Sequence, residues 1–368
     1  MRWGLDGRII ETKATGRNMV RSDRLYVSNV VKSMEERIKL TRLDLRGFAV
    51  LTEAATGAYA VTPVIAAMAG AREVVAFTRG SRFGPVEQVI AETNRLVRAV
   101  GSALPVTVVS RISPTEYSRF DIVTNSGHLR PITREHVMHM KTTAVIPLMY
   151  ESWELRKSDV DLQACRERGI KTAGTNEHND LLDVFAFLGP LVVHALHNAS
   201  VPVVGSRIAV VSNNAFGAPV VGHLLRNHAE VFCIGPKECF DEIDEAVLCG
   251  DFPTVELARH VDACVVATTP SVSSELTYDR YALTEFLGEL CPATCIHLWG
   301  DIDHKALVQS GIVMVPSGPV PDGHQGLAMG AVGPEPIIRL ITGGLKVGEI
   351  LVKKSESKVD LEFCQMIS

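Results

Sequence analysis

The stretch 207–236, RIAVVSNNAFGAPVVGHLLRNHAEVFCIGP, predicts how this chain folds. Its apolar, β-branched run at 208–211 is typical of a strand buried on both faces of a parallel sheet. A turn over 212–217 follows, then apolar residues at helical spacing over 219–226, then a second strand over 228–234. This order of strand, tight turn, helix and strand predicts the opening of a dinucleotide-binding βαβ unit.

The turn departs from the G-x-G-x-x-G fingerprint and keeps its third glycine. It reads Ser212-Asn213-Asn214-Ala215-Phe216-Gly217. That glycine allows close helix–strand packing, whereas the first two allow the backbone to approach a diphosphate. Asn213 and Asn214 tolerate left-handed backbone and helix N-termini attract anions, so we expect these six residues to line a cofactor. The next strand ends in FCIGP, with no acid for a ribose diol, so the alternative is a Rossmann fold that has lost its nucleotide.

Composition narrows the class of protein. A chain of 368 residues is too long for one ordinary core, and 46% hydrophobic with 21% charged residues is typical of a globular protein. A net charge of -5 and a pI near 6.2 disfavour nucleic acid as a partner. No uninterrupted apolar run is long enough to span a membrane, and the N-terminus lacks the apolar core of a secretion signal. We therefore expect a cytoplasmic protein.

The cysteines and histidines predict no metal site. The eight cysteines are scattered, as reduced thiols are in cytosolic proteins. Cys291 and Cys295, with His297 close by, lack a second ligand pair, so we interpret them as buried thiols beside a strand. In the run HLWGDIDH that begins at His297, Asp301 or Asp303 is expected to cap the following helix.

The pattern along the chain predicts an α/β fold with two Rossmann-like parallel-sheet domains and an interdomain cleft. A second alternation of strands and helices begins at Phe48, with expected strands at 48–53, 73–78, 106–110, 121–125, 144–148 and 170–172 and helices at 61–69 and 85–100. Strands at 263–267, 294–298 and 313–315 complete the second domain, and a helix is expected at 336–345. The predicted divisions are an N-terminal arm (1–46), a substrate domain (47–180), an interdomain helix (181–204) kinked or broken at Pro190, an NAD(P)-binding domain (205–333) and a C-terminal helix and tail (334–368).

Candidate site residues follow the strands, because ligands of open α/β sheets bind beyond the carboxyl ends. In the first domain they are Asn125, Ser126, Gly127 and Arg130, then Glu151 and Glu154, then Glu177 and His178, all expected to contact substrate except Glu154, which helix capping explains equally well. In the second domain Thr268, Thr269, Pro270, Trp299, Gly300 and Asp301 are expected to line the cofactor. The alternative for these groups is the capping of turns and helices.

His324 lies in a loop rich in proline and glycine, PDGHQG. A histidine facing a cleft suits proton transfer to a carbonyl, because its ordinary pKa is close to neutrality. We predict His324 as the acid/base and Asp322 as its orienting partner. The alternative is a loop histidine that only forms local hydrogen bonds.

Several of these motifs together resemble the D-2-hydroxyacid dehydrogenases. DVDLQACRERGI at 159–170, followed by Thr175-Asn176, resembles the stretch that leads to that family's interdomain helix. RIAVVSNNAFG, DACVVATTP, CIHLWGDIDHKAL and VPDGHQG then resemble, in order, its glycine fingerprint, a strand ending in proline, a strand and turn, and its histidine loop. The likeness covers about 120–330, and S-adenosylhomocysteine hydrolase and alanine dehydrogenase share the layout more distantly.

The chain also departs from this family. The family's substrate-binding arginine corresponds to Trp299, and 305–323 contains no glutamate to support the histidine. The resemblance implies the fold and a role for His324, but a substrate other than a simple 2-hydroxy acid. The first domain's TEAATGAYAVTP is itself Rossmann-like and favours binding of a nucleotide-like or amino-acid-like group.

The leading hypothesis is an NAD(P)-dependent oxidoreductase of the D-2-hydroxyacid dehydrogenase type, using NAD or NADP on a small polar substrate in a specialised biosynthetic pathway. It is expected to be a homodimer, as that family often is. The alternatives are a non-redox enzyme (lyase, cyclase or hydrolase) and a non-catalytic ligand-binding protein on the same scaffold.

Overall fold

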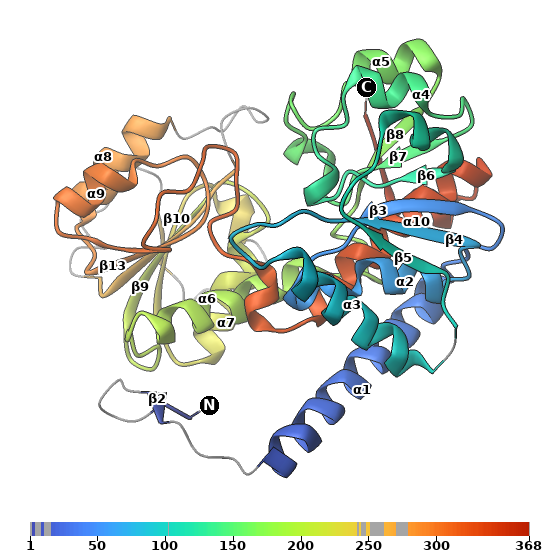
Figure 1. The fold of residues 1–368 in the computed structure, drawn as a ribbon. Coiled ribbons are helices and arrows are strands. Elements are labelled where there is room, and N and C mark those ends of the chain that lie inside the picture. The colour runs from blue at the N-terminus through green and yellow to red at the C-terminus, as the bar shows by residue number, and fades with distance from the viewer. Residues whose placement is uncertain are drawn as a thin grey trace.

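The computed structural model describes residues 2–3, 9–10, 16–101, 103–240, 243, 248–250, 261–269 and 279–367, with side chains from residue 25 onward except at 248–250. Two lobes are visible, each built on its own sheet (Figure 1). A short antiparallel pair, β1 (Arg2–Trp3) and β2 (Ile9–Ile10), precedes them. The predicted α/β class with two parallel-sheet domains is confirmed.

The first sheet is parallel apart from one edge strand. Its members are β3 (Ala49–Glu53), β4 (Glu73–Phe77), β5 (Val106–Val109), β6 (Ile122–Val123), β7 (Val145–Pro147), β8 (Lys171–Thr175) and β15 (Cys364–Met366). They lie in the order β15-β8-β7-β6-β3-β4-β5, with β15 antiparallel to β8. Every residue of β3 is buried, as expected of a central strand covered on both faces.

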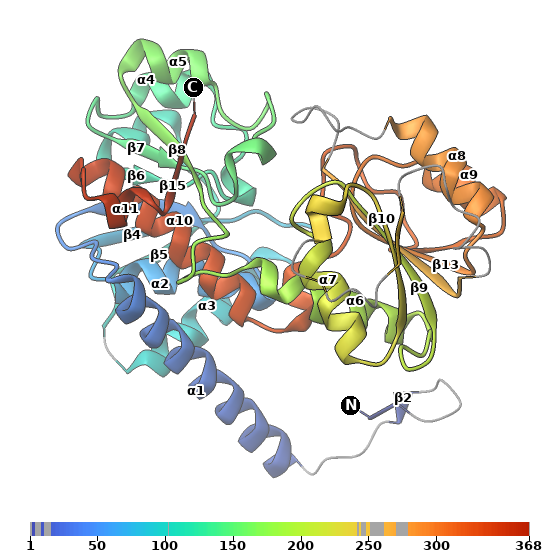
Figure 2. The same cartoon turned by 180° about the vertical axis from the view of Figure 1, so that it is seen from behind.

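Helices cover both faces of this sheet. One face packs against α1 (Gly16–Thr41), α2 (Thr62–Met68), α3 (Val86–Val100) and α10 (Glu335–Lys353). The other packs against the 3-10 helix η2 (Pro114–Arg119), α4 (Arg134–His139) and α5 (Leu162–Arg168). The apolar α10 crosses β7 and β8 (Figure 2), and a short helix, α11 (Lys358–Leu361), leads from it to β15.

The second sheet contains β9 (Arg207–Ser212), β10 (Glu230–Ile234), β11 (Leu248–Gly250), β12 (Ala263–Ala267), β13 (Thr294–Trp299) and β14 (Val313–Val315). Its order is β11-β10-β9-β12-β13-β14, and all the pairs are parallel. One face packs against α6 (Leu188–Asn198) and α7 (Gly217–Arg226), the other against α8 (Arg280–Leu290) and α9 (His304–Gln309). Asp303 caps α9 by accepting a hydrogen bond from the Ala306 amide at 3.1 Å, as predicted.

Both sheets have the strand order of a dinucleotide-binding fold. In each, the first strand of the unit is central, the second and third lie on one side, and the fourth to sixth lie on the other. The order therefore reverses between β3 and β6 in the first sheet and between β9 and β12 in the second. These switch points are where ligands of such sheets bind.

A single core cluster connects the lobes. It extends from α1 and α10 through α6 and α7 to one face of the second sheet. Within the predicted interdomain helix at 181–204, the helical part begins as a 3-10 turn, η5 (Phe185–Phe187), and continues as α6, which ends at Asn198. Pro190 lies in the first turn of α6, where its missing N–H is not needed, so the helix begins near it without a break inside α6.

Candidate active site

The carboxyl edges of the two sheets meet at a cluster of aromatic rings. Trp153, which follows β7, lies 5.3 Å from Trp299 at the end of β13 and 5.9 Å from Phe216 after β9, between ring centroids. Phe216 also lies 5.0 Å from Phe185. His178 is exposed and lies 4.2 Å from Phe185. Residues predicted to bind substrate and residues predicted to bind cofactor therefore come together here.

The turn after β9 is held by hydrogen bonds of its own polar side chains. The Ser212 hydroxyl donates to the Ala267 carbonyl at 2.9 Å, across the switch point from β9 to β12. The Asn213 Oδ1 accepts from the Thr269 amide at 2.9 Å. The Asn214 Oδ1 accepts from the Phe216 amide at 2.8 Å. Neither asparagine has a positive φ, so the left-handed backbone that their sequence allows is not used.

Gly217 has the packing role predicted for the third glycine. A Cβ at this position would lie 2.5 Å from the Phe240 ring and 3.0 Å from the Ser212 Cβ, too close for real atoms. The chain after β10 reads Gly235-Pro236-Lys237, without a carboxylate. The turn thus keeps the close packing of a dinucleotide-binding turn at the start of α7, without the carboxylate that usually recognises the ribose.

The turn after β13 is packed against the end of β12. Gly300 has φ 122°, and a Cβ there would lie 2.2 Å from the Thr268 Oγ1. Below it, the buried His297 donates from Nε2 to the Gly300 carbonyl at 2.6 Å, and its Nδ1 accepts from the His304 Nε2 at 2.6 Å. Burial, more than the neighbouring His304, lowers the pKa of His297 to about 4. This pair is therefore neutral and structural at ordinary pH.

The histidine loop is attached to this edge by its backbone. The Gly323 amide donates to the Asp301 carboxylate at 2.9 Å, and the Gly326 amide donates to the Leu298 carbonyl at 3.0 Å. A Cβ on Gly326 would lie 2.0 Å from the His297 carbonyl oxygen, so only glycine allows this approach. His324 consequently lies next to the carboxyl end of β13.

The contacts of His324 differ from those of a carboxylate-supported histidine. Its side chain is exposed, and its Nδ1 lies 3.0 Å from the Asp322 carbonyl oxygen. Because a carbonyl only accepts, Nδ1 carries the proton and Nε2 is left as the basic atom. The Asp322 carboxylate instead accepts two 3.0 Å hydrogen bonds from Arg280.

At the first switch point, hydroxyl groups bridge the strands. Thr52 at β3 lies 2.9 Å from Thr124 after β6, and Thr124 lies 2.5 Å from Ser126, between side-chain oxygens. Asn125 is fully buried, and its Oδ1 accepts from the Met149 amide at the end of β7 at 2.8 Å. Its Nδ2 has no hydrogen-bond partner within the described residues.

Glu53, at the end of β3, faces the predicted Gly127. Its Oε2 accepts from the His128 amide at 3.0 Å, and a Cβ on Gly127 would lie 2.8 Å from the same oxygen. Gly127 thus allows a buried carboxylate to approach the backbone closely. The sequence marked the stretch that begins at Thr52 for binding but did not single out Glu53.

Glu151 connects three parts of the first lobe. Its carboxylate accepts from the Trp153 Nε1 at 2.5 Å, from the Gln365 Nε2 at 3.1 Å and from the Glu177 amide at 3.3 Å. Gln365 belongs to β15 and also accepts from the Ser152 amide at 2.8 Å. The last strand of the chain therefore holds the segment that carries Trp153.

Two further carboxyl groups beside Glu151, those of Glu154 and Glu177, have strongly raised pKa values. Burial, and then the Glu151 charge, raises the pKa of Glu154 to about 8. Burial, and then Glu154 and Glu151, raises the pKa of Glu177 well above its usual range. Burial first, and then the negative charges of Glu53 and Glu177, raise the pKa of Tyr59 to about 12. Such perturbation marks candidate functional groups. Glu53 and Tyr59 lie in the stretch TEAATGAYAVTP that the sequence marked for binding, but neither was assigned a role of its own.

Arg130, predicted to bind a substrate carboxylate, forms an ion pair with Asp159. Its guanidinium lies 3.5 Å from Asp159 and over the Tyr150 ring, 5.6 Å from the centroid. Arg156 contacts the same carboxylate at 3.1 Å. The Arg130 charge is therefore shared with Asp159, whereas the sequence suggested a free group for a substrate carboxylate.

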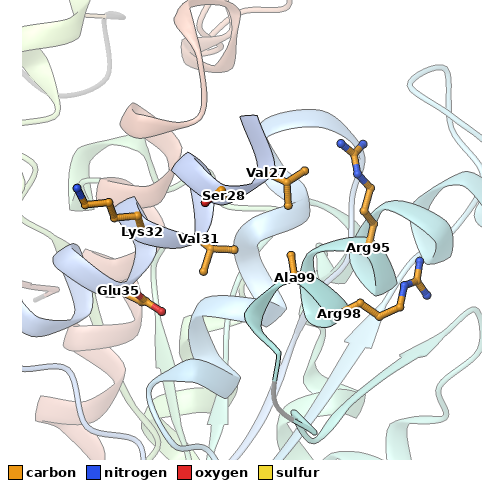
Figure 3. A pocket seen from close by; sticks show the side chains of 8 residues that line it. All are labelled: Val27, Ser28, Val31, Lys32, Glu35, Arg95, Arg98 and Ala99. Atoms are coloured by element: carbon orange, nitrogen blue, oxygen red, sulfur yellow. The ribbon is translucent and has the colours of Figure 1, made fainter. Parts of the chain in front are cut away.

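A hollow elsewhere is separate from both strand edges. It has a volume of about 810 Å³ and lies between α1 and α3, with Lys32, Glu35, Arg95 and Arg98 among its lining side chains (Figure 3). Pro270, predicted to line the cofactor, lies outside the described residues. Among the described residues no group of three or more His, Cys, Asp or Glu side chains is arranged to hold a metal, and none of the helices is long and apolar enough for a membrane span.

Comparison with known proteins supports the fold. No protein-family model matches the sequence, and no curated protein matches it. A dipicolinate synthase chain from Bacillus halodurans is similar in structure, with a TM-score of 0.56 and 14% identity over 85% of this chain and 99% of that one. The corresponding chain of dipicolinate synthase from Bacillus subtilis has a TM-score of 0.53 and 11% identity over 85% and 97%.

NAD-dependent formate dehydrogenase from Staphylococcus aureus, in complex with NAD, has a TM-score of 0.48 and 14% identity over 82% of this chain and 93% of that one. At these identities the likeness with the two dipicolinate synthase chains shows the two-domain fold.

Proposed function

We propose that this chain is an NAD(P)-dependent oxidoreductase of the D-2-hydroxyacid dehydrogenase type that acts on a small polar substrate in a specialised biosynthetic pathway. The observation that carries the proposal is the meeting of two carboxyl edges, each from a sheet of dinucleotide-binding strand order, at Trp153, Trp299 and Phe216. A substrate bound to one edge would face a cofactor bound to the other.

The second edge is the proposed cofactor side. The residues that would hold a dinucleotide are 212–217 at the start of α7, Thr268 and Thr269 after β12, and 299–301 after β13. When bound, the nicotinamide supplies or accepts a hydride. The turn 212–217 itself carries only neutral side chains, so it adds no negative charge at the α7 N-terminus, where a diphosphate would bind.

The first edge is the proposed substrate side, and His324 is the proposed acid/base. Asn125, Ser126, Gly127, Arg130, Glu151, Glu177 and His178 would surround or orient the substrate. The His324 Nε2 would take the proton of a carbinol, or return it to a carbonyl oxygen, because Nδ1 donates to Asp322. Asp322 would act through this carbonyl and through the Arg280 ion pair that holds the loop.

The cofactor side can be tested with an isosteric change of charge. Asn214→Asp keeps an acceptor for the Phe216 amide but adds a negative charge at the α7 N-terminus. We expect NADH or NADPH to raise the midpoint temperature of thermal unfolding of the full chain. Asn214→Asp should weaken binding of the nucleotide about tenfold or more. Asn94→Asp, on the exposed side of α3, is the matched control and should bind as the parent does.

The result that would overturn the proposal is the absence of a thermal shift with either nucleotide at millimolar concentration. A non-redox enzyme on the same scaffold is the second candidate, favoured by the lack of an acid after β10. It predicts bound nucleotide whose absorbance at the nicotinamide band stays constant through turnover.

A further inference from the structure

The carboxyl edge of the first sheet, called the first edge, carries a row of polar side chains that are mostly glutamates; this is the acidic row. Because β8, β7, β6 and β3 are neighbours in this order, Glu177, Glu151, Asn125 and Glu53 follow one another along the ends of these strands. Glu154 lies in η4 (Ser152–Glu154), one turn after Glu151. Ligands of parallel sheets bind at this end, so the row lies where a substrate is expected.

The two arginines that face this row are themselves paired with another carboxylate. The two nearby arginines, Arg130 and Arg156, both contact Asp159, at 3.5 Å and 3.1 Å. Glu177 is 6% exposed, and burial is the first cause of its raised pKa, with no basic side chain to oppose it. Buried carboxylates without a cation are costly, by several kcal/mol each. Arg130 and Arg156 therefore offset the burial of Glu154 only in part, and no basic side chain of the described residues offsets that of Glu177.

Asn125 supplies an independent indication of a ligand. It is 0% exposed, and its Oδ1 is fixed by the Met149 amide, so the side chain extends along the edge toward β7, which Glu151 follows. Its Nδ2 is left without an acceptor within the described residues. A buried donor without an acceptor costs about 1–3 kcal/mol, and a ligand oxygen would satisfy it.

We propose that the first edge binds a substrate carrying a positively charged amino group, held by Glu177 and Glu154, with an adjacent oxygen that accepts from the Asn125 Nδ2. This inference rests on the proposed function in taking the first edge as the substrate side. It names the substrate class as amino alcohols and their oxo forms. A 2-hydroxy acid would place its carboxylate against this acidic row.

Binding has a proton balance. An ammonium group that meets a protonated carboxyl forms an ion pair with the carboxylate, and the displaced proton goes to the buffer. The charged and titratable groups around Glu154 and Glu177 are Glu53, Tyr59, Arg130, Glu151 and Arg156. The raised pKa values of Glu154 and Glu177 mean that proton release accompanies binding near neutral pH.

The test uses three probes of matched size and different charge, titrated calorimetrically into the full chain without nucleotide: 2-aminoethanol, ethane-1,2-diol and glycolate. We expect 2-aminoethanol to bind, and glycolate and the diol to bind at least about tenfold more weakly. The binding heat of 2-aminoethanol should differ between two buffers of different ionisation enthalpy, because protons are released on binding. Binding of 2-aminoethanol should strengthen as the pH rises from 6 to 8.

Glu177→Gln separates this role from a structural one. The amide is isosteric and neutral, so the variant should be at least as stable as the parent at pH 8, yet bind 2-aminoethanol about tenfold more weakly and release fewer protons. Glu87→Gln, exposed on α3, is the control and should match the parent.

Three results would overturn the inference: tighter binding of glycolate than of 2-aminoethanol, no detectable binding of 2-aminoethanol, or unchanged binding in Glu177→Gln. A fourth result would also overturn the inference: low-millimolar Mg²⁺ or Ca²⁺ displaces 2-aminoethanol, and this metal binding is lost in Glu177→Gln. The row would then be a metal site. Because no nucleotide is present, none of these outcomes depends on whether NAD or NADP binds the second edge.

Discussion

The two sheets share a strand order but differ in the chemistry of their carboxyl edges. Both first turns carry a glycine five residues after a hydroxyl residue, Thr52 to Gly57 and Ser212 to Gly217. Both switch points are bridged by a side-chain hydrogen bond, Thr52 to Thr124 and Ser212 to the Ala267 carbonyl, each 2.9 Å long. Beyond these bridges, the first edge carries Glu53, Glu151 and Glu177, whereas the turn after β9 at the second edge carries amides and a hydroxyl. The same backbone plan is thus compatible with a cationic ligand on one side and an anionic one on the other.

Packing at the two edges differs as well. Gly217 contacts Phe240 so closely that a Cβ would lie 2.5 Å from the ring, whereas a Cβ on Gly57 would have nothing within 4 Å. The Gly57 amide instead donates to a side chain of α3, at the Glu92 Oε2, 2.7 Å away. The second turn is therefore the more tightly constrained, as preorganised binding of a large cofactor requires.

The largest effect should come from removing the contact between the edges. Trp299 is 6% exposed and lies against Trp153, so Trp299→Ala should lower the free energy of unfolding by about 4 kcal/mol. Denaturant unfolding followed by circular dichroism measures this. Tyr281→Ala, whose side chain is 76% exposed, is the control. A loss under about 1 kcal/mol for Trp299→Ala would mean that the two edges do not depend on this contact.

The next effect concerns the tight packing of the second edge. Gly326→Ala places a Cβ 2.0 Å from the His297 carbonyl oxygen and should cost about 3 kcal/mol. Gly318→Ala is matched, because a Cβ there has nothing within 4 Å and the residue has no positive φ. Equal unfolding midpoints for the two variants in urea would contradict the described attachment of the histidine loop.

The pH dependence of stability should have opposite signs at the two edges. His297 has its pKa lowered from 6.5 to about 4, so between these values the unfolded state binds more protons and stability is lost as the pH falls. Glu154 has its pKa raised from 4.5 to about 8, so the folded state binds more protons there and stability is lost as the pH rises. Each proton by which the folded and unfolded states differ changes the free energy of unfolding by about 1.4 kcal/mol per pH unit.

Urea titrations from pH 4 to 8 separate these contributions. His297→Asn should flatten the profile below pH 6.5, and Glu154→Gln should flatten it above pH 4.5. Glu285→Gln, exposed on α8, should leave both limbs unchanged. A Glu154→Gln profile that still falls toward pH 8 as steeply as the parent would refute the assignment of the alkaline limb to Glu154.

The smallest effects should come from single hydrogen bonds at the switch points. Asn213→Ala removes the acceptor of the Thr269 amide, and Thr52→Val removes the hydroxyl that meets Thr124. Each should cost about 1 kcal/mol in unfolding free energy. Asn213→Ala should also weaken NADH binding, whereas Thr52→Val should leave it unchanged; the reverse pattern would exchange the roles of the two turns.

Much of the fold was predictable because its strands are continuous apolar runs. The expected strands 263–267 and 313–315 coincide with β12 and β14, and the predicted cap at Asp303 is present. The prediction for Pro190 was less specific, because sequence shows that proline cannot continue a hydrogen-bond ladder but not where in the helix it falls. The strand β15 was not predicted, since its three residues gain their place only from pairing with β8 and from the contact of Gln365 with Glu151.

The sequence marked Glu151, Glu154 and Glu177 at strand ends but could not show that they lie together, for a physical reason. Glu53, Glu151 and Glu177 are far apart in the chain, and only the strand order places them together. Glu53 also ends a strand that reads as uniformly buried, so nothing locally distinguishes it from a helix-capping acid. Asp322 was predicted to orient His324, but it meets the imidazole through its backbone carbonyl, and its carboxylate is bound by Arg280 on α8, which only the fold brings near.

The central claim is that the second sheet, and not the equally Rossmann-like first, takes the nucleotide. Hydrogen–deuterium exchange of the full chain, with and without saturating NADH, tests it most directly because exchange locates protection along the backbone. We predict protection of peptides spanning 207–226 and 294–301, with 49–61 unchanged. Protection confined to 49–61 would contradict the account and move the cofactor to the first sheet.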